Sequence, residues 1–227
     1  MMFFTNKGRV YKLRAWQIPE AGRQARGTAI VNLLQLDSDE KITAGIKIHG
    51  DEKDMYLIMA TKQGMVKKTP LEQYENIRKG GIAAITLKED DELIGTRLTD
   101  GSYDIILVTE NGLSIRFSEK DVRPMGRTSM GVMGIRLNKE DNVISMVPYF
   151  ENTTLLVVTA NGFGKRTDLD EYKVQNRGGK GVLTYRVTDK TGLLVGAMSV
   201  SEDDDLQLIS SDGTIIRMHV DGISVLS

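Results

Sequence analysis

The pattern Ser/Thr-x-x-Gly-x-x-x-Lys/Arg occurs five times in this chain at nearly even intervals. The copies start at Thr5, Thr61, Thr109, Thr159 and Ser210. Their glycines (8, 64, 112, 162 and 213) are 56, 48, 50 and 51 residues apart by subtraction. A period of this length is typical of one supersecondary unit used repeatedly. The pattern therefore restricts the fold to a repeat architecture, and each unit carries a cation four residues after its glycine.

Composition excludes several classes of protein. The 227 residues include no cysteine, so disulfides and thiolate metal sites are excluded, and we expect a reducing cytoplasm. No apolar run approaches the roughly 18 residues of a membrane span. The net charge is −1, from 30 basic and 31 acidic residues. Because an anionic polymer responds to the local field, this balance leaves a nucleic-acid partner open.

Each glycine lies between two short apolar runs. The runs before it are Met55–Met59, Ile105–Val108, Leu155–Val158 and Leu206–Ile209, and the residues after it are basic at the tip. Asn-Gly and Asp-Gly between apolar runs are strong β-hairpin signals, since the turn requires a positive φ. The repeat therefore predicts one β-hairpin per copy.

A second signature follows each hairpin after a polar loop. It begins with glycine and has apolar residues at every second position, as in Gly27–Leu33, Gly81–Leu87, Gly131–Leu137 and Gly181–Val187. This period predicts a strand with one buried face. An acidic turn (Asp37–Glu40, Glu89–Glu92, Lys139–Asp141) precedes a fourth apolar run, such as Leu93–Leu98, Val143–Val147 or Leu193–Val200.

Four strands in about 50 residues, repeated without helix, predict an all-β fold of radially arranged blades. We expect a single domain over residues 1–227, with units at 1–54, 55–104, 105–154, 155–205 and a partial one at 206–227. Leu71–Arg78 and Ser118–Arg123 are expected to form short turns. Five hairpins against four Gly-initiated strands suggest a fragment of a longer chain.

Basic residues recur at the same phase of each unit. Equal phase means equivalent position in a radial repeat, so these cations should form a band suited to a phosphate backbone. Paired glycines between cations would let backbone N–H groups approach phosphates. The alternative is edge protection of strands by solvated cations. The candidate DNA-binding residues are Lys12, Arg23, Arg26, Lys67, Lys68, Arg78, Lys79, Arg116, Arg127, Lys165, Arg166, Arg177, Gly178, Gly179, Lys180 and Arg217.

One loop narrows the family. Gln175-Asn176-Arg177-Gly178-Gly179-Lys180-Gly181 resembles the Gln-Arg-Arg-Gly-Gly-Arg/Lys-Gly box of the DNA gyrase A family. Further phrases are similar to that family's C-terminal domain, and the resemblance covers essentially the whole chain. They include Gly8-Arg-Val-Tyr-Lys, Gln17-Ile-Pro-Glu-Ala, Val122-Arg-Pro-Met-Gly-Arg and Asn161-Gly-Phe-Gly-Lys-Arg-Thr.

The resemblance implies a β-pinwheel, a propeller-like ring whose blades exchange strands, here with about five blades that are possibly a truncation from six. It implies a non-catalytic domain that wraps double-stranded DNA around a basic rim and supports negative supercoiling. The parent enzyme would be a bacterial type II topoisomerase whose A and B subunits assemble in the cytoplasm at the nucleoid. That enzyme would use ATP and Mg²⁺ elsewhere, so no cofactor is expected in this segment.

The family's box belongs to the first blade, whereas the match here lies in the fourth unit and has Asn176 where a cation is usual. We therefore expect the true box upstream of residue 1. Two alternatives remain open, namely the equivalent domain of the topoisomerase IV A subunit, or a protein-binding β-propeller.

We find no nucleophile–base pair in the sequence. His49 and His219 have no metal-ligand spacing, and Asp203–Asp205 lacks the glycine and distal glutamate of a calcium loop. Trp16, followed by Pro19, is expected to anchor the first loop.

Overall fold

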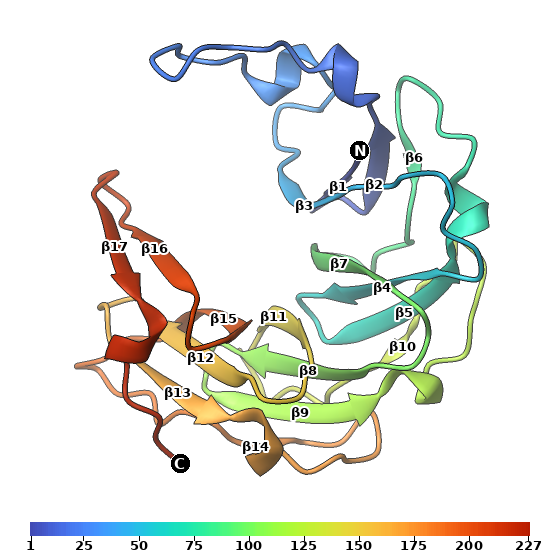
Figure 1. Cartoon of the computed structure of the whole chain (residues 1–227). Helices are drawn as coiled ribbons and strands as arrows, with labels where there is room; N and C mark the ends of the chain where they lie inside the picture. Colours follow the sequence, from blue (N-terminus) through green and yellow to red (C-terminus); the bar gives the residue numbers. More distant parts are fainter. The chain divides into compact units, whose positions relative to one another are not determined.

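The computed structural model describes all residues, 1–227, and it contains strands, short 3₁₀ helices and loops (Figure 1). The all-β prediction is confirmed. No helix has the length and apolar character that crossing a membrane would require.

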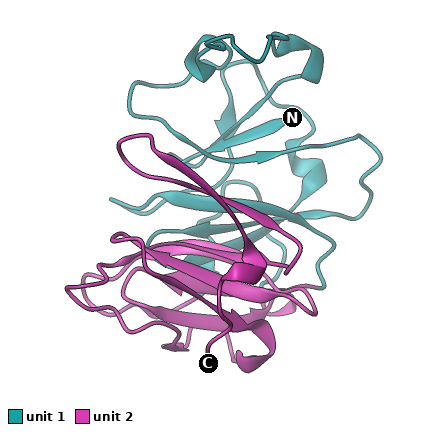
Figure 2. Cartoon of the chain, turned by 60° about the vertical axis from the view of Figure 1, so that its left-hand side comes forward, with its two compact units in different colours: residues 1–102, 122–134 teal, residues 103–121, 135–227 magenta.

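The chain divides into two compact units (Figure 2). Unit 1 comprises residues 1–102 and 122–134, and unit 2 comprises residues 103–121 and 135–227. Both units are built from the same hairpin-centred sheets, and each is described separately.

All five predicted hairpins form. They are β1 (Met2–Thr5) with β2 (Arg9–Lys12), β4 (Tyr56–Thr61) with β5 (Met65–Pro70), β8 (Asp104–Thr109) with β9 (Leu113–Ser118), β12 (Thr154–Thr159) with β13 (Gly164–Asp168), and β16 (Asp205–Ile209) with β17 (Ile215–His219). In each turn the glycine N–H donates to the carbonyl of the Ser/Thr three residues earlier. Only the glycine has positive φ, between +72° and +87°, so each loop is a three-residue turn that ends in a left-handed residue.

The threonine that opens the pattern caps the same turn. Its Oγ1 accepts a hydrogen bond from the backbone N–H four residues later, as Thr109 does from Leu113 at 3.1 Å and Thr159 from Phe163 at 3.1 Å. The first four copies share this bond. In the fifth, the Ser210 hydroxyl donates to the Thr214 carbonyl instead. The first letter of the pattern is therefore explained by turn geometry.

The acidic turns connect to the fourth strands, which are β3 (Ile42–Ile46), β7 (Leu93–Thr99), β11 (Val143–Pro148) and β15 (Leu194–Val200). Each of these strands pairs with the first strand of its own hairpin. Three acidic side chains of these turns are buried, Glu40, Asp91 and Asp141. Asp91 accepts the N–H of Gln63 at 2.8 Å, and Asp141 accepts that of Asn111 at 3.2 Å. These carboxylates thus lock the hairpin turns.

The Gly-initiated segments join the hairpin of the preceding repeat rather than their own. β6 (Ile82–Ala83) pairs with β2, β10 (Val132–Met133) with β5, and β14 (Val182–Leu183) with β9. The strand orders are β3-β1-β2-β6, β10-β5-β4-β7 and β11-β8-β9-β14, followed by β13-β12-β15 and β16-β17. This exchange of strands is what the resemblance to the pinwheel implied.

Two expectations about these segments need correction. The exchanged strands are two residues long, because the chain leaves the sheet edge after them. Residues 27–33 form no strand at all and instead contain the 3₁₀ helix η2 (Ile30–Asn32). The other three segments each pair with a hairpin of the preceding repeat, whereas residues 27–33 pair with no strand in this structure.

The two expected turns are 3₁₀ helices. They are η3 (Leu71–Tyr74) and η4 (Glu119–Asp121), and η1 (Ala15–Gln17), η5 (Leu169–Glu171) and η6 (Val220–Gly222) follow the other hairpins. Each stands where the chain leaves the second strand of a hairpin. The expectation for Trp16, in η1, was wrong: its side chain is 78% exposed and anchors nothing.

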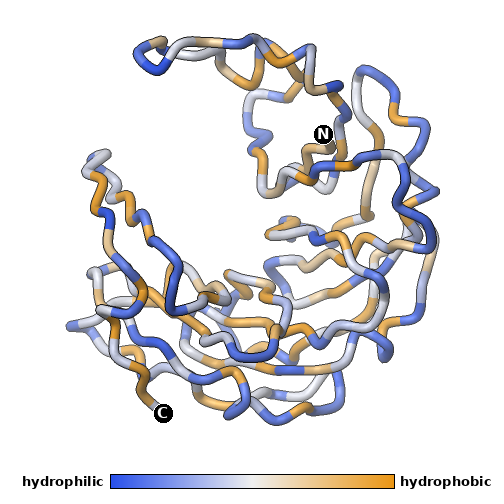
Figure 3. Tube along the Cα trace, in the orientation of Figure 1, coloured by the Kyte–Doolittle hydropathy of each residue, from blue (hydrophilic) through white to orange (hydrophobic).

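The core is formed by the hairpins and fourth strands. Figure 3 shows hydrophobic stretches along the strands and hydrophilic ones in the connecting loops. In unit 1 Phe4, Val10, Leu57 and Met59 are fully buried with Tyr74. In unit 2 Ile106, Val108, Leu155 and Val157 form the equivalent cluster with Tyr172. Tyr74 and Tyr172 occupy equivalent positions in their repeats, and both pack into the core.

Candidate nucleic-acid interface

The basic loops are the segments that lead from each hairpin to the exchanged strand that follows it. They run along the second strand of the hairpin in the preceding repeat. In unit 2 the loop runs along β9, where the Gln175 N–H donates to the Arg116 carbonyl at 2.7 Å, and it returns as β14. At Gly181, φ is +78°, and a Cβ would lie 2.3 Å from the Ser114 carbonyl oxygen. Only glycine permits this close approach, which fixes the height of the loop on the sheet edge.

The same arrangement recurs in unit 1. The Met125 N–H donates to the Lys68 carbonyl at 2.9 Å, and a Cβ on Gly131 would lie 2.4 Å from the Val66 carbonyl oxygen. The Arg127 guanidinium donates to the Ala83 carbonyl at 2.6 Å, which ties this loop to β6. Because β10 and β14 end their strand orders opposite β7 and β11, the basic loops and the fourth strands occupy opposite edges of each sheet.

Many of the predicted cations are accessible on the surface. Side chains of ten predicted residues are exposed or half-exposed, and these are Lys12, Arg23, Arg26, Arg78, Lys79, Arg127, Lys165, Arg177, Lys180 and Arg217. Gly178 and Gly179 are half-buried between Arg177 and Lys180, and Gly178 has a φ of +81°. Arg217 is held by the exposed carboxylate of Asp205.

Three residues of the predicted set are almost fully buried. Lys67, Lys68 and Arg166 are 0%, 4% and 3% exposed, so they offer phosphate no surface. Arg116 is largely buried as well, with its side chain 12% exposed and 2.9 Å from the Asp104 carboxylate. Its guanidinium also lies over the Tyr149 ring, 3.6 Å from the centroid. The burial of these side chains does not support the predicted phosphate contacts.

The cation that closes the repeat has a structural partner instead. Arg116 donates to the carbonyl of Tyr172, which follows η5, at 3.1 Å, and to that of Leu169, the first residue of η5, at 3.3 Å. Arg166 donates to the carbonyl of Ile223, which follows η6, at 2.7 Å. Lys12 reaches the carbonyl of Glu75, which follows η3, at 3.4 Å. Because the last carbonyls of a helical turn lack partners and carry partial negative charge, each cation fastens the next repeat to its own.

Lys67 is buried for a related reason. Its Nζ donates to the Ala84 carbonyl at 2.6 Å and to the Arg127 carbonyl. Burial lowers the pKa of Lys67 to about 7, with a smaller effect from the charge of Arg127. Lys67 therefore holds the basic loop from beneath, through the backbone carbonyl of Arg127.

The structure brings further cations to the outer edge that sequence reasoning missed. The Arg136 N–H donates to the Gly179 carbonyl at 2.8 Å, and its side chain is exposed, as is that of Arg186. In unit 1 the Arg9 guanidinium reaches the Gly80 carbonyl. A sequence signal was present for the first two: residues 122–139 and 173–188 contain no Asp or Glu, and neither do residues 21–36 and 76–88.

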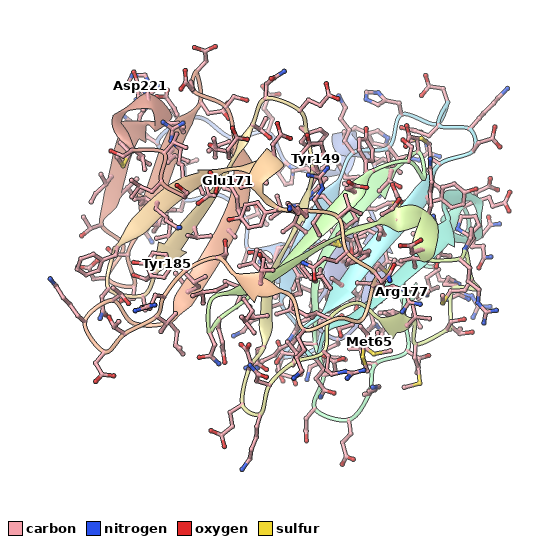
Figure 4. The ribbon with its side chains drawn as sticks, turned by 90° about the horizontal axis from the view of Figure 1, so that it is seen from below. Met65, Tyr149, Glu171, Arg177, Tyr185 and Asp221 are labelled. Carbon is pink, nitrogen blue, oxygen red and sulfur yellow. The ribbon has the colours of Figure 1, made fainter.

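Acidic side chains lie elsewhere in the units. In Figure 4, Glu171 and Asp221 on the 3₁₀ helices lie toward one side of unit 2, and Arg177 lies toward the other. At the hairpin turns the acidic residues form local pairs, such as Lys7 with Asp39 at 2.5 Å. The chain contains no cluster of three or more His, Cys, Asp or Glu that could hold a metal ion. The geometry thus offers acid-free basic loops as the site.

Comparisons with known proteins agree with the repeat architecture. A family model described as DNA gyrase C-terminal domain, beta-propeller, matches residues 1–48, 56–100, 103–149, 153–201 and 204–227. These five segments coincide with the five hairpin-centred repeats.

Two curated relatives are A subunits of DNA gyrase. The one from Clostridium acetobutylicum is 55% identical over 227 residues, which is 100% of this chain and 27% of the relative. The one from Mycolicibacterium smegmatis is 47% identical over 219 residues, or 96% of this chain and 26% of the relative. The chain spans about a quarter of the length of these relatives.

Two solved structures are also similar. The C-terminal domain of a DNA topoisomerase IV matches with a TM-score of 0.91 and 29% identity, covering 99% of this chain and 71% of that one. A DNA gyrase A C-terminal domain matches with a TM-score of 0.85 and 26% identity, covering 99% and 73%.

Proposed function

Because the chain belongs to the DNA gyrase C-terminal domain family of β-propellers, we propose that it binds double-stranded DNA and bends it around its basic outer edges. The observation that carries the proposal is the recurrence of exposed cations on acid-free loops, three of which lie at one edge of a sheet, beside β6, β10 and β14. Cations at both edges would hold DNA no better than a uniform surface, whereas a single basic edge gives the duplex a defined path.

Binding would act mainly on phosphates. Lys and Arg neutralise the backbone and release counterions, and this mode carries little sequence preference. In unit 2 the contacts would come from Arg136, Arg177, Lys180 and Arg186. In unit 1 they would come from Arg78, Lys79 and Arg127, with Arg23 and Arg26 on the first loop. Lys12, Lys165 and Arg217 would be secondary, since they lie on the hairpin strands β2, β13 and β17 and not on the basic loops.

In the proposed setting the chain is the non-catalytic part of a gyrase A polypeptide. Its partners would be DNA, the rest of that polypeptide and gyrase B, in the bacterial cytoplasm at the nucleoid. ATP and Mg²⁺ would serve other parts of that type II topoisomerase. The identity of 55% to a curated gyrase A relative over the full chain supports this setting.

The salt dependence of DNA affinity tests the proposal. Replacing Arg177, Lys180 and Arg186 together by Gln should lower affinity and reduce the slope of log K against log salt by about 0.9 per lost phosphate contact. Fluorescence anisotropy with a labelled duplex at several salt concentrations measures the slope.

The matched control replaces three exposed lysines that lie outside the basic loops by Gln, namely Lys41, Lys53 and Lys120. This variant has the same net charge and should keep the slope. Equal slopes for the two triple variants would reject the basic edge, and binding insensitive to salt would favour a protein-binding propeller.

A second candidate rests on the TM-score of 0.91 to the topoisomerase IV domain. That homologue would bend DNA without strong chiral wrapping. The two candidates differ in DNA topology, which is a property of the whole molecule.

A further inference from the structure

Apolar side chains stand exposed in the middle of the basic edges. The residue two positions after the second-signature glycine is exposed in every exchanged strand, as Ala83, Met133 and Leu183. Met133 is 45% exposed and Leu183 is 60% exposed. The next residue is buried in all three, as Ala84, Gly134 and Thr184. The strand therefore directs this position away from the core at a constant phase.

The exposure of Leu183 does not result from a missing strand partner. β14 pairs fully with β9, with Leu183 opposite Leu113 and Val182 opposite Ser114. As the last strand in the order β11-β8-β9-β14, β14 lies at the open margin of the sheet. A bulky partner can reach Leu183 there.

Within its own segment of chain, Leu183 is flanked by cations and by no acidic residue. Lys180 and Arg186 are each three residues away, at most about 10 Å of extended chain. Arg136 joins them through its bond to Gly179, and Arg177 precedes the glycine pair. Residues 173–188 contain no acidic side chain. An apolar tip between two cations matches a minor groove about 6 Å wide with a phosphate row on each side.

We infer that Leu183 is a wedge that enters the DNA minor groove and partly unstacks one base step, while Lys180 and Arg186 bind the flanking phosphates. The inference rests on the proposed DNA binding and adds a contact to the bases. Apolar wedges of this kind kink the duplex and make bending easier. Pyrimidine–purine steps unstack most readily, so the domain should favour DNA that places a TA or CA step at this point.

The test uses the complete 227-residue chain and a duplex with 2-aminopurine next to a single TA step. Wild-type protein should raise the 2-aminopurine fluorescence, which reports unstacking. Leu183→Ser should lose the rise and keep the salt slope, because no phosphate contact is removed. Leu183→Met should retain the rise, since Met also serves as a wedge.

Val195→Ser is the matched control. Val195 lies in β15 of the same unit and is also 60% exposed, but it is not in a basic loop. This variant should keep both the fluorescence rise and the slope. Loss of the rise in Val195→Ser, or its persistence in Leu183→Ser, overturns the wedge while DNA binding stands. Wild-type protein that shows no salt-dependent binding rejects the proposed function itself, and the wedge with it.

Discussion

At the scale of single residues, Lys67 shows how a basic side chain can serve a DNA-binding surface without facing it. Its amine is buried against two carbonyls, those of Ala84 and Arg127. A neutral amine has two N–H donors, which is the number that these acceptors use. The lowered pKa of Lys67, about 7, follows mainly from burial.

This pKa predicts a pH-dependent stability. In the unfolded chain a lysine titrates near its ordinary pKa of about 10.4. Between pH 7 and 10 the unfolded chain therefore binds a proton that the folded chain does not, and stability rises with pH, by at most about 1.4 kcal/mol per unit. Lys67→Met should lose this term. In urea unfolding of both proteins at pH 7, 8 and 9, the free energy of unfolding of the wild type should rise relative to that of the variant. A difference that stays constant with pH would contradict the prediction.

At the scale of elements, the repeat joins each hairpin to the next 3₁₀ helix. The closing cation binds carbonyls at the helix end, as Arg116 does at η5 and Arg166 at η6. Parallel bridges at the same residues, Arg116 with Val174 and Arg166 with Val225, hold the following segment in register. The basic loop thus starts from a fixed point on its sheet.

Removing this link should cost stability but not DNA affinity. Arg116→Met leaves the Asp104 carboxylate and two carbonyls without their partner in a mostly buried site, so we expect a loss of about 2–3 kcal/mol. Chemical unfolding measures the loss, and anisotropy should show an unchanged salt slope. Arg217→Met is the control, because its exposed pair with Asp205 should contribute little. A reduced salt slope in Arg116→Met would show that Arg116 does contact phosphate.

At the scale of the whole molecule, a net charge of −1 coexists with basic loops that hold no acid. The field that DNA meets is set by where the charges lie, because screening over about 8 Å hides more distant carboxylates at physiological salt. In the sheets β10-β5-β4-β7 and β11-β8-β9-β14 a basic loop lies at one edge and a fourth strand at the other, so the proposed DNA contacts are confined to the basic edge.

DNA topology distinguishes the two candidate settings. Nicked circular DNA that is religated in the presence of the chain should gain positive writhe if the chain wraps as a gyrase A domain does. A control ligation with the Arg177, Lys180 and Arg186 triple Gln variant should show a smaller change. An unchanged linking number with intact binding would favour topoisomerase IV-type bending.

Local chemistry determined most of the architecture. Glycine at a left-handed turn position and threonine four residues before a turn amide require no distant partner, so five hairpins could be read from the sequence. Apolar runs after the acidic turns likewise located the fourth strands, and an even repeat spacing located the basic loops. Segment 27–33 carried the same local signal and failed, because a strand also needs a neighbouring ladder.

Only the tertiary structure decided which cations face solvent. Lys67, Lys68 and Arg166 have the same sequence phase as exposed cations, but burial depends on what the next repeat places over them. Arg136 and Arg186 reached the basic edge through strand exchange, which pairs a segment with the hairpin about 70 residues earlier by difference of residue numbers (181 and 112). The sequence specifies the single repeat through short-range turn and strand preferences. Contacts between successive repeats then decide whether each charged side chain forms a structural bond or lies on the surface.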